Sequence, residues 1–209
     1  MRITDLLDKR SISLDAVCAS KSDALDQAVA LMVKSGKIND EEAYRKQVYL
    51  REEESTTGIG EGIAIPHGKC DAVTKPGLAA MVIKDGVDFD SLDDEPVNLL
   101  FLIAAPNTED NIHLDVLSKL SMLLMDENFV EKLKNASSVD EFLEIVDAAD
   151  EEKPDLNDQL AAQTETEGSV CRIIAVTSCP TGIAHTYMAA EGLEKAAKSH
   201  NCSIKVETR

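Results

Sequence analysis

Two reactive side chains stand out in this sequence, an imidazole and a thiol, each placed after a short apolar run. His67 follows the apolar residues 63–65 and Pro66, and a glycine comes directly after it. Because backbone of this composition has little freedom, the ring is expected at the end of a strand, where a neutral imidazole can attack an electrophile. The alternative is a histidine that serves only the structure of a loop.

The thiol is that of Cys179, in the segment SCPTGIAHT, residues 178–186, between a predicted strand and a predicted helix. Backbone N–H groups of a tight loop and the positive end of the following helix can bind a phosphate dianion, and they favour the thiolate of Cys179. The alternative is a buried cysteine beside a helix cap. The residues expected to bind phosphate are Pro180, Thr181, Gly182, Ile183, Ala184, His185 and Thr186.

The spacing of this loop is similar to the Cys-x5-Arg loop of small tyrosine phosphatases, but His185 occupies the position of the arginine. Without a guanidinium at that position, a phosphoryl group held on the thiol is a more natural outcome than hydrolysis. A phosphatase-like enzyme centred on Cys179 remains open as an alternative.

Two further polar side chains could complete a site around His67. His113 is expected at the start of a helix that follows a long apolar strand. Arg51 is one of few cations in an acidic stretch and could neutralise a phosphoryl group. The alternative for Arg51 is an exposed helix charge paired with residues 52–54. The residues present require no metal.

Composition narrows the class of protein. The chain has 209 residues, 44% of them hydrophobic, a formal charge of −18 and 3% aromatic residues, which argues against nucleic-acid binding. No apolar run approaches the roughly 18–20 residues that span a bilayer, and the first residues lack the apolar core of a signal peptide, so a cytoplasmic location without membrane insertion is expected. Free thiols are expected, because no C-x-x-C pair occurs among Cys18, Cys70, Cys171, Cys179 and Cys202.

Hydrophobic periodicity and capping signals predict a mixed α/β domain over residues 1–148. Helices are expected at 22–36, 39–53, from 113, at 129–133 and from 138, and strands at 62–66, 78–84 and 98–105. The dipeptide Asp85-Gly86 predicts a hairpin that pairs residues 78–84 with 87–89.

Beyond this domain the composition shifts to an acidic flexible linker over residues 149–169. A partial βαβ unit is predicted over 170–209, with strands at 170–177 and 202–207 around a helix at 188–198. A unit of about 40 residues seldom buries enough surface to be stable alone, so the chain is expected to be cut short inside its second domain.

The segment GIGEGIAIPHGK, residues 58–69, resembles the active-site segment of enzyme IIA domains of the bacterial phosphoenolpyruvate-dependent sugar phosphotransferase system, fructose–mannitol class. Arg51, and His113 in NIHLDVLSKLSMLL, match the other two polar positions that this family uses. SCPTGIAHTYMAAEGLEKAA is similar to the phosphocysteine loop and first helix of a fructose-type enzyme IIB domain, which is normally about twice as long as residues 170–209.

The resemblance implies a mixed β-sheet flanked by helices and a phosphoryl relay without a cofactor other than the phosphoryl group carried covalently. Phospho-HPr would phosphorylate His67, with His113 holding the ring or the phosphoryl oxygens and Arg51 offsetting their charge. Thr56 or Thr57 would donate hydrogen bonds to the phosphoryl group. The group would pass to Cys179 and then to a sugar, with fructose favoured, at a membrane subunit IIC.

Two alternatives remain open beside the relay and the phosphatase. One is a regulatory phospho-switch of the IIA type that transports no sugar; it would need no downstream cysteine. The other is an interaction module in which the histidine and the cysteine are only structural.

Overall fold

The computed structural model describes residues 2–107, 112–152, 172–177, 192–193, 196–197 and 203–208. The chain divides into two compact units, Met1–Glu152 and Lys153–Arg209. Each unit is described by itself below.

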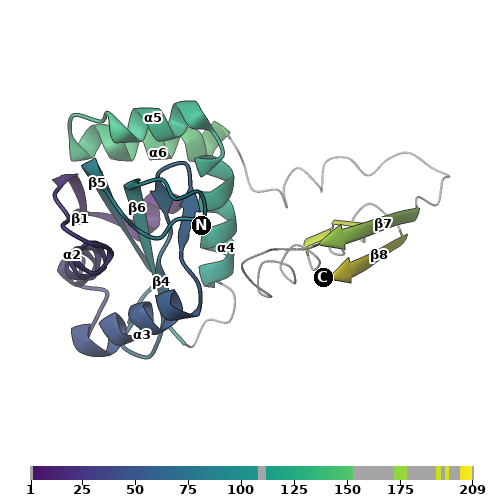
Figure 1. Cartoon of the computed structure of the whole chain (residues 1–209), viewed down its shortest axis with the longest axis horizontal. Coiled ribbons are helices and arrows are strands. Elements are labelled where there is room, and N and C mark those ends of the chain that lie inside the picture. Colours follow the sequence, from purple (N-terminus) through teal and green to yellow (C-terminus); the bar gives the residue numbers. More distant parts are fainter. Residues whose placement is uncertain are drawn as a thin grey trace. The chain divides into compact units, whose positions relative to one another are not determined.

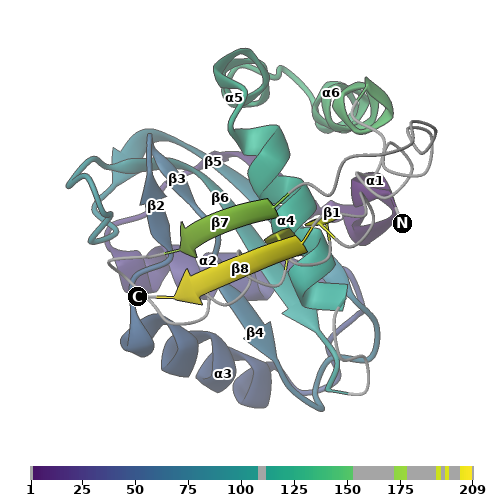
Figure 2. The same cartoon turned by 90° about the vertical axis from the view of Figure 1, so that its right-hand side faces the viewer.

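The N-terminal unit contains a mixed sheet with helices on both faces (Figures 1 and 2). The strands follow the order β1-β5-β6-β3-β2, and β4 also pairs with β6. Pairing is parallel between β1 and β5 and antiparallel between β5 and β6, while β3 and β4 both run parallel to β6. The predicted mixed sheet flanked by helices is confirmed. Its elements are α1 (Ile3–Leu6), β1 (Leu7–Ala16), α2 (Lys21–Lys34), α3 (Glu41–Glu54), β2 (Gly58–Gly60), β3 (Ile63–Ala64), β4 (His67–Lys69), β5 (Gly77–Val87), β6 (Val97–Ala105), α4 (Ile112–Leu124), α5 (Glu127–Lys134) and α6 (Val139–Glu152).

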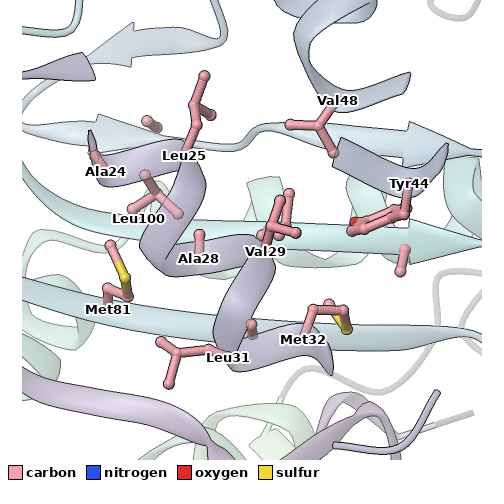
Figure 3. Close-up of a cluster of buried hydrophobic side chains, with 14 of the residues drawn as sticks. Ala24, Leu25, Ala28, Val29, Leu31, Met32, Tyr44, Val48, Met81 and Leu100 are labelled. Carbon is pink, nitrogen blue, oxygen red and sulfur yellow. The ribbon is translucent and has the colours of Figure 1, made fainter. Parts of the chain in front are cut away.

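Alternate side chains of β6 pack into two separate hydrophobic clusters, as expected for a strand buried on both faces. Leu100 and Leu102 belong to the cluster formed with α2 and α3, part of which Figure 3 shows around Val29 and Tyr44. Phe101 and Ile103 belong to the cluster formed with α1, α4, α5 and α6. The central strand predicted at residues 98–105 is therefore confirmed, and it separates the α3 side of the unit from the α4 side.

A side-chain cap lies at the start of both α2 and α3. Ser20 accepts a hydrogen bond from the N–H of Asp23 at the start of α2. Asp40 accepts one from the N–H of Ala43 at the start of α3, so the cap lies one residue after the expected start of this helix at residue 39. Both bonds satisfy donors that the first helical turn leaves free.

The hairpin predicted at Asp85-Gly86 is wrong. Strand β5 continues through this dipeptide to Val87, which pairs with Val97 of β6. Gly86 has a φ of +70°, and the β5–β6 register shifts between Val82 and Val87. Gly86 therefore allows an irregularity within one long strand and does not form the turn of a hairpin.

In the C-terminal unit the described strands β7 (Arg172–Thr177) and β8 (Ser203–Thr208) pair in parallel, which confirms the predicted strand pairing. Residues 192–193 and 196–197 are helical, within the range predicted as a helix. Residues 153–171 and the loop 178–186 lie outside the described residues. In the described part of the chain, no helix is both long and apolar enough to cross a membrane.

Candidate active site

The backbone around His67 is attached to the central strand on one side. β3 pairs with Leu99 and Leu100 of β6, and β4 pairs His67 with Ile103. Between these two strands Pro66 accepts a hydrogen bond from the N–H of Ile103 at 3.0 Å. Proline lacks an N–H, so the strand is interrupted here without leaving a donor unpaired. His67 is thus the first residue of β4, not a loop residue after a strand as predicted.

Gly68 decides on which face of the sheet the imidazole lies. A Cβ atom at Gly68 would come within 3.0 Å of Tyr44 Cε2 and of Val48 Cγ2, both on α3. Successive side chains of a strand point to opposite faces, so His67 lies on the α4 face, as does its partner Ile103. The absence of a side chain at Gly68 allows α3 to lie close against β4 directly beside the half-buried imidazole.

Both ring nitrogens of His67 have hydrogen-bond partners. Nε2 lies 3.0 Å from Nε of Arg51, and Nδ1 lies 3.1 Å from the carbonyl oxygen of Ile65. The guanidinium can only donate and a carbonyl can only accept, so these contacts assign the ring proton to Nδ1 and a lone pair to Nε2. The nitrogen that can act as a nucleophile is Nε2, and it faces Arg51.

Arg51 reaches the imidazole from the last turn of α3, where a cation is favoured by the helix dipole. Its Nη1 donates to the carbonyl oxygen of Ser55 at 3.1 Å and to the Ser55 hydroxyl at 3.2 Å. The guanidinium is therefore bound to His67 and to the end of its own helix, instead of forming the alternative pairs with residues 52–54. Sequence reasoning missed Ser55, although its position four residues after Arg51, at the helix end, was a usable signal.

The two threonines proposed as phosphoryl donors have other partners in this structure. The Thr56 hydroxyl donates to the carbonyl oxygen of Phe89 at 3.2 Å. The hydroxyl and the N–H of buried Thr57 both donate to the carboxylate of Glu52, at 2.5 and 2.9 Å. The structure does not bring either hydroxyl to His67, and their role at a phosphoryl group stays a prediction.

The other predicted site residues are placed only in part. His113 is the second residue of α4, and its side chain lies outside the described part of the chain. Strand β7 ends at Thr177, two residues before Cys179, which confirms the predicted strand ahead of the cysteine. Cys179 and the phosphate-binding residues of its loop lie outside the described residues; these are Pro180, Thr181, Gly182, Ile183, Ala184, His185 and Thr186.

The thiols that the structure does describe are poor nucleophiles. Cys18 and Cys70 are free, and burial raises the pKa of each thiol above its usual value of 9.0. Both are therefore protonated at neutral pH, which leaves them less reactive than a thiolate.

Lys69, directly before Cys70, adds a positive charge beside the imidazole. Its side chain lies on the same face of β4 as that of His67.

The geometry suits the transfer of an anionic group. A neutral imidazole presents Nε2 at the edge of the sheet, and a guanidinium that donates to this nitrogen can donate instead to the oxygens of an arriving phosphoryl group. No cluster of three or more His, Cys, Asp or Glu side chains suited to a metal occurs among the described residues.

Family models match both units of the chain. The model described as "Phosphoenolpyruvate-dependent sugar phosphotransferase system, EIIA 2" covers residues 5–149, which include Arg51, His67 and His113. The model described as "PTS system, Lactose/Cellobiose specific IIB subunit" covers residues 174–209, which include Cys179.

Individual proteins are similar either to the whole chain or to about two thirds of it. The fructose-specific EIIABC component of Bacillus subtilis is 44% identical over 208 residues, which is 100% of this chain and 33% of that protein. The chain thus spans about a third of the length of such curated relatives. The crystal structure of the nitrogen regulatory protein IIA-Ntr from Neisseria meningitidis is 30% identical, with a TM-score of 0.65 over 69% of this chain and 98% of that one. The NMR structure of the Escherichia coli complex of mannitol enzyme IIA with phosphorylated mannitol enzyme IIB is 34% identical, with a TM-score of 0.59 over 67% of this chain and 96% of that one.

Proposed function

The chain belongs to the EIIA type 2 family of the phosphoenolpyruvate-dependent sugar phosphotransferase system, and we propose that it carries a phosphoryl group from phospho-HPr to Cys179 through His67. The observation that supports this function best is the 3.0 Å contact between Arg51 Nε and His67 Nε2. It places a fixed positive charge at the nitrogen where negative charge must arrive.

In the first step the lone pair of His67 Nε2 attacks phosphorus. The new P–N bond forms as the P–N bond of the phosphohistidine in HPr breaks, and the electron pair of that bond returns to the imidazole of HPr. The proton on His67 Nδ1 stays in place, bound to the carbonyl oxygen of Ile65. Arg51 moves its donor from Nε2 to the phosphoryl oxygens, and His113 is the second side chain expected to contact them. Such a transfer requires mainly alignment and charge stabilisation from the protein.

In the second step the thiolate of Cys179 takes the phosphoryl group. The P–N bond to Nε2 breaks as a P–S bond forms, and the loop 180–186 provides N–H donors for the oxygens. The group then passes to a sugar at a membrane subunit IIC, with the chain itself in the cytoplasm. The similarity of this chain to a third of the fructose-specific EIIABC component of Bacillus subtilis favours fructose as that sugar.

Labelling from radioactive phosphoenolpyruvate, with enzyme I and HPr added, tests the relay. The wild-type chain should be labelled, and His67→Ala should abolish the label, while His200→Ala, outside both motifs, should retain it. Cys179→Ser should carry an acid-labile label on histidine. Full labelling of His67→Ala would overturn the assignment, and release of inorganic phosphate from an aryl phosphate by the chain alone would favour a phosphatase instead.

A regulatory phospho-switch is the second candidate, because the nitrogen regulatory protein IIA-Ntr shares the fold of the N-terminal unit at 30% identity. A switch of this type would accept the phosphoryl group on His67 and keep it there. One measurement, the label on Cys179 in a mixture of two chains, distinguishes the two functions. In the relay, phosphoryl groups on His67 of the Cys179→Ser chain move to added wild-type chain, and Cys179 of the wild-type chain becomes labelled. In a switch, no cysteine becomes labelled in any mixture.

A further inference from the structure

We propose that Glu52 is a positioning residue for the phosphoryl-accepting imidazole, acting through Thr57 and Ile65; the inference rests on the proposed function of His67. Glu52 does not touch the ring. Its carboxylate instead begins a continuous series of hydrogen bonds that ends at His67 Nδ1.

The carboxylate of Glu52 is held on three sides. Its side chain is only 6% exposed, and it accepts the N–H of Thr57 at 2.9 Å and the hydroxyl of Thr57 at 2.5 Å. The ammonium of Lys21, from α2, lies 2.9 Å from it. Charge-assisted bonds in a buried position are among the stronger polar contacts in proteins, and the lysine compensates the buried charge. Thr57 is therefore fixed in one position.

From Thr57 the series continues through the backbone to the imidazole. The carbonyl oxygen of Thr57 accepts the N–H of Ile65 at 3.0 Å. The carbonyl oxygen of Ile65 in turn lies 3.1 Å from His67 Nδ1 and accepts its proton. This last bond decides the tautomer, because a proton on Nδ1 leaves the lone pair on Nε2. Glu52 thus supports, together with the donor Arg51, the tautomer in which Nε2 is the nucleophile.

The same loop also holds the guanidinium. Ser55, two residues before Thr57, accepts both hydrogen bonds of Arg51 Nη1. If the carboxylate of Glu52 is removed, Thr57 loses both hydrogen bonds that it donates to this side chain of α3, which weakens the support of Ser55 on one side and of Ile65 on the other. A displacement of about 1 Å in a reacting group can cost roughly 100-fold in rate.

Lys21 extends the network beyond the helix that carries Arg51. Its ammonium also lies 3.3 Å from the carboxylate of Asp90 and 4.9 Å from the ring centre of Phe89. Phe89 is the residue whose carbonyl oxygen accepts the Thr56 hydroxyl. The lysine therefore joins α2, the Glu52 carboxylate and the segment that follows β5.

The test compares Glu52→Ala and Thr57→Val with Glu53→Gln in the full chain. Glu53 is the exposed neighbour on the same helix, so its replacement removes an equal charge without touching the loop. Thr57→Val keeps the N–H bond to Glu52 and removes only the hydroxyl. Two readouts are needed: the rate of phosphorylation by phospho-HPr, and the ¹⁵N chemical shifts of the His67 ring in the unphosphorylated protein, which report the tautomer and do not depend on turnover.

The expected result is a roughly 10- to 100-fold lower rate in Glu52→Ala. A smaller loss is expected in Thr57→Val, and no change in Glu53→Gln. Both ring nitrogens should move toward averaged ¹⁵N shifts in Glu52→Ala, while the wild type and Glu53→Gln show one protonated Nδ1 and one unprotonated Nε2. If Glu52→Ala does not fold, Thr57→Val and Glu52→Gln decide the question with the same readouts.

Two outcomes separate failure of this inference from failure of the proposed function. A wild-type chain that phospho-HPr does not label contradicts the proposed function, and the tautomer shifts then still decide whether Glu52 positions the ring. A labelled wild type combined with folded Glu52 variants that match Glu53→Gln in rate and tautomer overturns the inference.

Discussion

The N-terminal unit holds buried carboxylates in two regions, at Glu52 on α3 and at Asp150 on α6. Each is bound by a lysine and by a backbone N–H: Lys21 and Thr57 for Glu52, Lys119 and Ile3 for Asp150. Their side chains are 6% and 2% exposed, respectively. The two helices lie on opposite sides of the unit (Figure 1).

The two carboxylates differ in what their hydrogen-bond and ion-pair partners connect. The bonds of Glu52 lead into the loop 55–57, and from there to the imidazole of His67. The bonds of Asp150 join three helices, since Ile3 belongs to α1 and Lys119 to α4. The same local chemistry can therefore position a reactive group in one region and fasten helices together in another.

Replacement of Asp150 by alanine should give the largest loss of stability. The mostly buried pair of Lys119 with Asp150 would be broken, and breaking such a pair costs about 3–5 kcal/mol. Asp140→Ala, which removes an exposed partner of Lys9, should cost at most about 1 kcal/mol. Denaturant unfolding measures both. If the comparison holds, the folded Asp150 variant keeps the wild-type tautomer of His67; a changed tautomer would show that the two regions are not separate.

Replacement of Arg51 by alanine should give the largest loss of rate without a matching loss of stability. Removing one donor that stabilises developing charge typically lowers a rate by about 10²–10³-fold. Arg51→Lys should recover only part of the loss, because an ammonium cannot reproduce the fork of donors to His67 and Ser55. Arg45, on the same helix but paired with Glu41, provides the control. Equal rates for Arg51→Ala and Arg45→Ala would contradict the role given to the guanidinium.

Gly68→Ala tests the close approach of α3 to β4. The added methyl group would meet Tyr44 and Val48 at about 3.0 Å, so the helix and the strand must separate by a few tenths of an ångström. Overpacking of this kind costs about 1–3 kcal/mol, and the rate should fall as Arg51 moves away from the imidazole. At Gly192, which is helical, a Cβ meets nothing within 4 Å, so Gly192→Ala should not lower stability or rate. An unchanged rate in Gly68→Ala would mean that the helix position is not critical.

Replacement of an exposed carboxylate, that of Asp93, should have the smallest effect on stability. The backbone N–H groups of Glu61 and Glu95 hold the pKa of Asp93 below its usual value of 3.8. A carboxyl group with a lowered pKa in the folded state stabilises the fold above that usual value and loses this contribution as the pH falls through its folded value. Asp93→Asn should therefore be less stable than the wild type at pH 7, and thermal unfolding should show the gap narrowing as the pH falls below 3.8. A gap that does not narrow below this pH would exclude this origin.

Much of the fold could be predicted where the signal is local. The apolar run of β6 and the amphipathic run of α2 are read directly from neighbouring residues, although the cap of α2 is Ser20 and not residue 22, where the helix was expected to begin. Strand β1 was not predicted, since Asp8, Lys9 and Arg10 break its pattern and its pairing with the distant β5 contains register shifts. The acidic residues up to Glu152 belong to α6, although residues from 149 onward were predicted as linker. The contacts of Asp150 with distant helices explain this longer helix, and local sequence does not show them.

The family, and His67 with Arg51 as its candidate site, could also be predicted, because spacing and motif carry that information. The role of Glu52 could not. Residues 52–54 are three consecutive glutamates, and only the burial of the first distinguishes it from the two exposed ones. Side-chain hydrogen bonds such as Arg51 to Ser55 likewise depend on the path of the chain after the helix, which composition does not specify.

The nitrogen that carries the phosphoryl group is the most direct test of the account. The chain, labelled with ¹⁵N in its histidines and phosphorylated through phospho-HPr, can be examined by NMR for coupling between phosphorus and each ring nitrogen. Coupling to Nε2 of His67 is expected, with the proton retained on Nδ1. Phosphorus on Nδ1 of His67, or on any other histidine in the Cys179→Ser chain, would contradict it.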